Sequence, residues 1–132
     1  MNFVIDTHIF LWMFTNSKRI NAEKLDILKN PQNNILLTNL SFWEIAIKYN
    51  IGKIKLKGET PDNLPNIAKE LDLEIINIDA QIMANSYQLS PVEKHKDPFD
   101  RMLIWFCIQN NYTFMSNDDK LHEYEKQGLK WI

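Results

Sequence analysis

Acidic side chains occur along this chain at points where a parallel sheet would bring them together. Asp6 follows the first apolar run, Glu44 begins the segment after the second, Asp100 lies in a DPFD stretch and Asp118 follows the run YTFM. Carboxylates that meet in a half-buried cleft repel one another unless a counter-charge is present. Oxygen ligands without a cysteine or histidine cluster favour Mg²⁺ or Mn²⁺ over Zn²⁺. The pattern therefore predicts a divalent metal site of the kind that assists phosphodiester hydrolysis.

Each of these acids also has a purely structural explanation. Asp6 and Asp118 are typical of residues that cap a turn or a helix after a strand. Glu44 stands three residues after Ser41, which is the spacing of a helix capping box. The coincidence of several acids at strand ends, rather than any single acid, carries the metal hypothesis.

The segment HKDPFDRML opens a predicted helix with two acids. Asp97 before Pro98 is a usual pair for the cap and first position of a helix. Asp100 would then fall in the first turn, where an acid also favours the helix dipole. The residues alone leave open whether Asp100 caps the helix or faces a metal.

Short apolar runs alternate with helical patterns along the chain. Strands are predicted at 3–5, 35–38, 73–78 and 112–115 and in the terminal KWI; helices are predicted at 8–14, from 41 to a stop at Gly52, at 63–73, 79–89, 98–110 and 119–126. Residues 53–59 suit either an edge strand or a loop. The alternation predicts an α/β fold, a three-layer α/β/α sandwich with a mainly parallel central sheet of four to five strands. Ligands of such sheets bind beyond the carboxyl ends of the strands, where the acids are expected.

Length and composition agree with one domain spanning residues 1–132. Hydrophobic residues make up 45% of the chain, charged residues 24%, and the net charge is −2, so no global positive field points to a nucleic acid. The single cysteine, Cys107, excludes an internal disulfide and is expected to be a buried hydrophobe. The N-terminus lacks the pattern of a signal peptide, and no run is long enough for a membrane span. A cytoplasmic protein is expected.

Several stretches together resemble the PIN-domain ribonucleases, in particular the VapC-like toxins of bacterial toxin–antitoxin pairs. They are FVIDTHIFLW, SFWEIAIKYNIGKIKL, HKDPFDRMLI and FMSNDDKL, followed by the terminal KWI. They occur in the family's order and span nearly the whole chain.

The resemblance implies a site and a cofactor. Asp6, Glu44, Asp100 and Asp118 match the four acids that bind Mg²⁺ or Mn²⁺ and support RNA cleavage in the family. The fourth motif is usually T-x-D and reads Ser-Asn-Asp here, so Ser116 keeps the hydroxyl and Asp119 is an alternative to Asp118. Accessory roles are expected for Asp97, Ser116, Arg101 and Thr7.

The resemblance also implies partners. These are an RNA substrate, with tRNA and other structured RNAs as candidates, a cognate antitoxin protein and a second copy of the chain in a homodimer. Basic residues expected to contact RNA are Lys48, Lys53, Lys55 and Arg101, although solvated charges explain the lysines equally well, and Arg101 could instead pair with Asp97. His8 and His95 are expected to form hydrogen bonds near the site rather than to ligate metal, and His122 is expected at the surface.

Two other functions remain open from the sequence. One is a catalytically silent PIN fold that only binds a partner. The other is a phosphoryl-transfer domain of the phosphatase or receiver type, although the Asp-x-Asp motif of such phosphatases is absent after the first strand.

Overall fold

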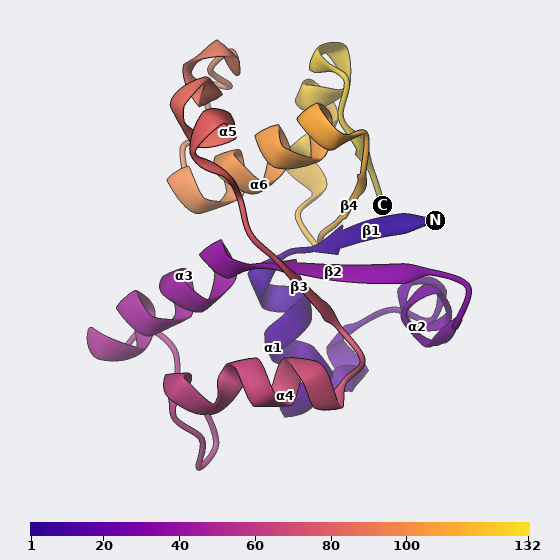
Figure 1. The fold of residues 1–132 in the computed structure, drawn as a ribbon, viewed down its shortest axis with the longest axis vertical. Coiled ribbons are helices and arrows are strands. Elements are labelled where there is room, and N and C mark those ends of the chain that lie inside the picture. The colour runs from indigo at the N-terminus through magenta and orange to yellow at the C-terminus, as the bar shows by residue number, and fades with distance from the viewer.

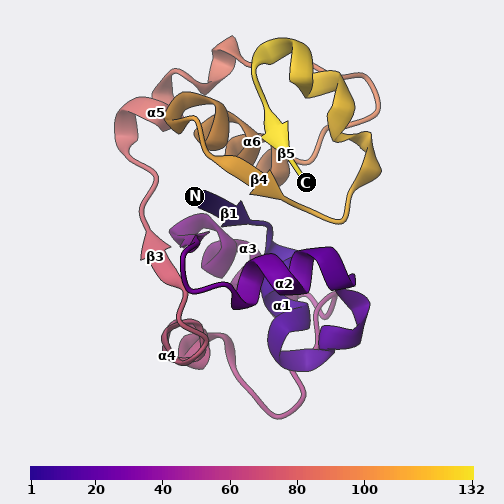
Figure 2. The same cartoon turned by 90° about the vertical axis from the view of Figure 1, so that its right-hand side faces the viewer.

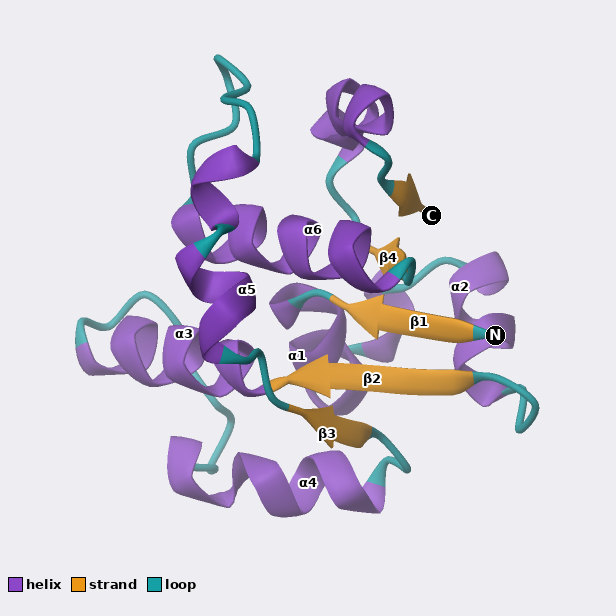
Figure 3. Cartoon of the chain, turned by 45° about the horizontal axis from the view of Figure 1, so that its top comes forward, coloured by secondary structure: helices purple, strands orange, loops and turns teal.

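Five short parallel strands form one sheet in the order β3-β2-β1-β4-β5. The computed structural model describes all 132 residues. The strands are β1 (Asn2–Ile5), β2 (Asn34–Thr38), β3 (Glu74–Ile76), β4 (Thr113–Met115) and β5 (Lys130–Trp131). Because all five are parallel, their carboxyl ends meet at one edge, and Figure 3 shows β1 and β2 pointing the same way. The predicted five-strand α/β architecture is confirmed.

Helices cover both faces of the sheet. The α-helices are α1 (Thr7–Thr15), α2 (Ala22–Lys29), α3 (Asn39–Asn50), α4 (Leu64–Glu70), α5 (Ala80–Ala84) and α6 (Pro98–Asn110). Short 3-10 helices are η1 (Ser17–Arg19), η2 (Pro61–Asn63), η3 (Ser86–Gln88) and η4 (Asp119–Gln127). Figures 1 and 2 show α1 to α4 on one side of the sheet and α5, α6 and the C-terminal segment on the other. None of these helices has the length and apolar character that crossing a membrane requires.

The apolar side chains form two cores, and alternate residues of a strand belong to different cores. In β1, Phe3 and Ile5 pack with the residues of α1, α3 and α4, while Val4 packs with those of α6 and η4. This is the expected period of two in a strand whose faces are both covered. The central strand β1 is thus fixed from both sides, and so is the residue that follows it, Asp6.

Some predicted elements differ from the structure. Helix α2 was not predicted; its sequence AEKLDILK is half polar, and its one fully buried residue is a lysine. Residues 53–59 form a loop, not a strand, and the predicted helix over 79–89 divides into α5 and η3. Strand β3 covers three residues of the predicted 73–78, since it pairs on one side only, with β2.

Candidate active site

Asp6 is placed by the central strand and held by hydrogen bonds to both carboxylate oxygens. It caps α1, and its Oδ1 accepts from the Ile9 amide at 2.8 Å. Its Oδ2 accepts from the Ser116 hydroxyl at 2.6 Å. The residue is only 6% exposed, and burial raises the pKa of its carboxyl despite these hydrogen bonds. A cation at this carboxylate would oppose that effect by favouring the charged form.

Ser116 connects the first and fourth predicted site positions. Besides donating to Asp6, its hydroxyl accepts from the Asp118 amide at 3.1 Å. The Ser116 carbonyl accepts from the ammonium of Lys24 at 2.8 Å. Lys24 is buried, and its local sequence pattern did not predict a role near the site.

Glu44 is buried in α3 and contacts α1 rather than the start of its own helix. Its Oε1 accepts from the Thr7 hydroxyl at 2.6 Å, and Thr7 Oγ1 lies 3.0 Å from Ser41 Oγ. The capping box, which the sequence left open as an alternative for Glu44, is therefore wrong: α3 begins at Asn39, so Ser41 lies inside the helix. The motif's hydroxyl and carboxylate serve a tertiary contact instead.

Lys48 neutralises the other oxygen of Glu44. The two side chains form an ion pair one helical turn apart, with the Lys48 ammonium against Oε2. Burial lowers the pKa of Lys48, but the hydrogen bond and the charge of Glu44 outweigh it and raise the pKa overall. Lys48, expected to contact RNA, thus lies at the acid cluster itself. Lys53 and Lys55 are exposed on the loop after α3.

The sequence left open whether Asp100 caps α6 or faces a metal, and in the structure the cap is Asp97. Asp97 caps α6, since its Oδ1 accepts from the amides of Phe99 and Asp100 at 2.8 and 3.1 Å. Asp100, in the first turn, is free of capping hydrogen bonds. Burial and the charges of Asp97, Asp6 and Glu44 raise its pKa to about 7. Two acids from distant segments, Asp6 and Glu44, thus act on Asp100 together with its neighbour Asp97, as expected for converging carboxylates.

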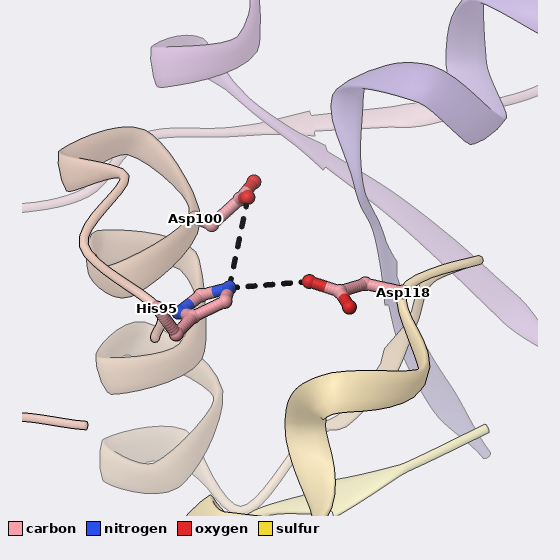
Figure 4. Close-up of side chains that lie close together, drawn as sticks. All are labelled: His95, Asp100 and Asp118. Atoms are coloured by element: carbon pink, nitrogen blue, oxygen red, sulfur yellow. Dashed lines mark ion pairs between the residues drawn. The ribbon is translucent and has the colours of Figure 1, made fainter. Parts of the chain in front are cut away.

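Asp118 lies across from Asp100, and His95 lies between them (Figure 4). His95 Nε2 is 3.2 Å from Asp118 Oδ2 and 3.8 Å from Asp100 Oδ2. Asp119, the alternative fourth acid, is exposed and outside this cluster. The histidine is 6% exposed, and its depth in the site was not predicted.

The side chain of Arg101 pairs neither with the Asp97 carboxylate nor with the acid cluster. Its guanidinium donates to the Leu89 carbonyl at 2.9 Å and to the Tyr124 hydroxyl at 3.0 Å. The predicted alternative of a pair with Asp97 is wrong, because the side chain is directed to the loop before α6 and to η4. This contact fixes the loop that carries His95 against both elements.

The donor set fits a divalent cation. Asp100 and Asp118 lie with His95 in one group of possible ligands, and the buried His95 Nε2 has no hydrogen-bond partner. Asp6 and Glu44 are not in that group, but their charges act on Asp100. A surface hollow of about 800 Å³ is lined by residues of 90–95 and 120–127, His95 among them, and by none of the four predicted site acids. Of the possible ligands, only His95 therefore borders this hollow.

Comparisons with known proteins identify the family of the chain. The chain from residue 3 to residue 127 matches the family model of the PIN domain. No curated protein sequence matches the chain.

Solved structures of similar fold cover the chain end to end. A chain of VapBC2 from Rickettsia felis, crystallised with a DNA fragment from their promoter, has a TM-score of 0.67 and 19% identity over 100% of this chain and 98% of that one. A chain of VapBC-1 from nontypeable Haemophilus influenzae has a TM-score of 0.64 and 16% identity over 100% and 97%. One from DNA-bound VapBC of Salmonella typhimurium has a TM-score of 0.63 and 17% identity over 100% and 97%. With a family match over residues 3–127, this chain belongs to the PIN-domain family.

Proposed function

We propose that this protein is a metal-dependent endoribonuclease that hydrolyses RNA phosphodiester bonds. The observation that carries the proposal is the position of Asp100: burial and the charges of Asp97, Asp6 and Glu44 raise its pKa to about 7, and Asp118 lies beside it against His95. Membership of the PIN-domain family supports a nuclease. Strongly shifted pKa values cluster at functional sites, and this favours a catalytic site over a silent binding domain.

In this proposal the four acids hold Mg²⁺ or Mn²⁺. When bound, the cation supplies positive charge to the carboxylates and the substrate phosphate and makes a nearby water more acidic. The chain contributes rigid placement: Ser116 orients Asp6, Thr7 orients Glu44, and Asp97 sets the start of the helix that carries Asp100. Lys48 forms an ion pair with Glu44, and its ammonium can approach a phosphate at the rim of the site.

The partners we propose are RNA, a cognate antitoxin and a second copy of the chain. The similar solved chains come from VapBC complexes, which supports the antitoxin. Trp43 offers a contact surface, since it is 60% exposed and packs edge-on against Phe99 at 5.5 Å between ring centroids. These two aromatic residues adjoin Glu44 and Asp100 in the sequence, so a segment bound to them would lie near the acids.

Cleavage of labelled RNA tests the function. The purified chain is incubated with tRNAs and unstructured RNAs in Mg²⁺, Mn²⁺ or EDTA, beside Asp6→Asn and Asp100→Asn. Asp119→Asn is the matched control, because it removes an exposed carboxylate outside the cluster. We expect metal-dependent cuts with the wild type and the control and none with the two site variants. Cuts that persist in both site variants, or no cut by the folded protein, would contradict the proposal.

A further inference from the structure

His95 directs a buried, unpartnered nitrogen at two site acids. The side chain is 6% exposed, and Nε2 has no hydrogen-bond partner. Asp118 Oδ2 is only 3.2 Å away, yet it is too far off the direction of an N–H bond to accept from it. A buried nitrogen in this position needs a hydrogen-bond or metal partner, and a cation would stabilise the two carboxylates beside it.

The other ring nitrogen of His95 is held as metal-binding histidines usually are. Nδ1 lies 2.8 Å from the hydroxyl of Tyr124, which also accepts from Arg101 at 3.0 Å. The hydroxyl's own proton has the His95 carbonyl oxygen within reach at 3.5 Å. The hydroxyl can therefore accept from an Nδ1–H, and this leaves the lone pair on Nε2. A fixed hydrogen bond at one nitrogen that frees the other is the usual support of a histidine ligand.

The spacing of the three donors suits one ion. One ligand atom each from His95, Asp100 and Asp118 can be chosen so that all lie within 4.8 Å of one another. Ligands bonded at about 2.1 Å in an octahedral shell lie roughly 3 Å apart when adjacent and roughly 4 Å apart when opposite. Small side-chain rotations of the two partly exposed acids would bring the three atoms into such a shell.

We propose that His95 Nε2 is a ligand of a divalent ion shared with Asp100 and Asp118, and that this nitrogen makes the centre prefer Mn²⁺ to Mg²⁺. Mg²⁺ binds oxygen ligands and keeps its waters, whereas imidazole suits transition metals. This ion would occupy the site of the proposed nuclease. Only its use in RNA cleavage rests on the proposed function.

Metal binding to the full-length protein tests the inference without any RNA. The chain is stripped with EDTA and titrated with Mn²⁺ and with Mg²⁺ by calorimetry. The bound Mn²⁺ is then examined by pulsed electron paramagnetic resonance for coupling to a directly bound nitrogen. The chain has three histidines, so His8→Gln and His122→Gln, both at exposed positions, are matched controls for His95→Gln.

We expect a nitrogen coupling in the wild type and in both controls, and its loss in His95→Gln. The same substitution should weaken Mn²⁺ binding by roughly 10- to 100-fold, as losses at metal sites do, and Mg²⁺ binding much less. An absent coupling in the wild type, a coupling that persists in His95→Gln, or an equal loss of both metals would overturn the inference. Should His95→Gln fail to fold, the wild-type spectrum, with the two control variants, still decides.

The two proposals fail in different ways. A protein that shows the nitrogen coupling but cleaves no RNA would retain the histidine ligand and refute the nuclease. Metal-dependent cleavage without the coupling would keep the nuclease and refute His95 as a metal ligand.

Discussion

Asp100→Asn should stabilise the metal-free protein while it removes RNA cleavage. The pKa of Asp100 is raised from 3.8 to about 7, first by burial and then by Asp97, Asp6 and Glu44. Because the folded state binds this proton more tightly than the unfolded state, stability should fall as the pH rises from about 4 to 7, and the penalty is complete above pH 7. Asparagine keeps the size of the side chain and cannot ionise.

The magnitude follows from the pKa. The difference between 3.8 and about 7 corresponds to about 4 kcal/mol. The side chain is 32% exposed, so screening by water reduces this to about 2 kcal/mol. The lost charge at the N-terminus of α6 removes a further ~0.5 kcal/mol of favourable dipole interaction. We expect a net gain of about 1.5 kcal/mol at pH 8.5 and little difference near pH 4.

Urea unfolding in EDTA at pH 4, 7 and 8.5 measures this difference. Asp119→Asn controls for the removal of one exposed negative charge and should show no comparable gain. Added Mn²⁺ should raise the stability of the wild type more than that of Asp100→Asn, because the variant lacks a ligand. An unchanged or lower stability of Asp100→Asn at pH 8.5, or a gain of equal size at every pH, would refute the crowding of the acids.

Three further substitutions or modifications test the supports of the site. Ser116→Ala removes the buried hydrogen bond that lowers the pKa of Asp6. We expect the free energy of unfolding in urea to fall by about 1–3 kcal/mol and Mn²⁺ binding, measured by calorimetry, to shift to higher pH. An unshifted pH profile of Mn²⁺ binding would contradict the role of Ser116 in lowering the pKa of Asp6. Thr7→Val removes the donor to Glu44 and should cost about 1–3 kcal/mol while Thr7→Ser costs less; equal losses in thermal melts would show that the hydroxyl is unimportant. Burial raises the pKa of the Cys107 thiol, so a thiol reagent at pH 8 should modify it only after unfolding, and fast labelling of the native protein would disprove its burial.

The sequence predicted the framework of the site better than its interior. Asp6 could be placed because a strand end is a local pattern, and Asp97 because a helix cap is one. For Glu44 the spacing from Ser41 offered a capping box as the alternative to a metal site, whereas its hydrogen-bond partner, Thr7, is 37 residues away. The role of His95 depends on Tyr124, 29 residues further along. Contacts between residues far apart in the sequence form only when the helices and strands pack, so no local spacing rule predicts them.

The central position of β1 divides the site into two halves of different mobility. The Asp6 amide donates to the Met115 carbonyl at 3.0 Å, and the Ser116 amide donates to the Ile132 carbonyl at 3.0 Å. The first bond extends the pairing of β1 with β4 inside the sheet, so the Asp6 hydrogen should exchange with solvent only when the whole domain unfolds; the second joins β4 to the chain end beyond the edge strand β5. Asp100 and Asp118 instead stand at the beginnings of helices, where fraying is easier. The site thus combines the fixed Asp6 with the more adjustable Asp100 and Asp118. An incoming ligand can reposition these two acids without disturbing the fold.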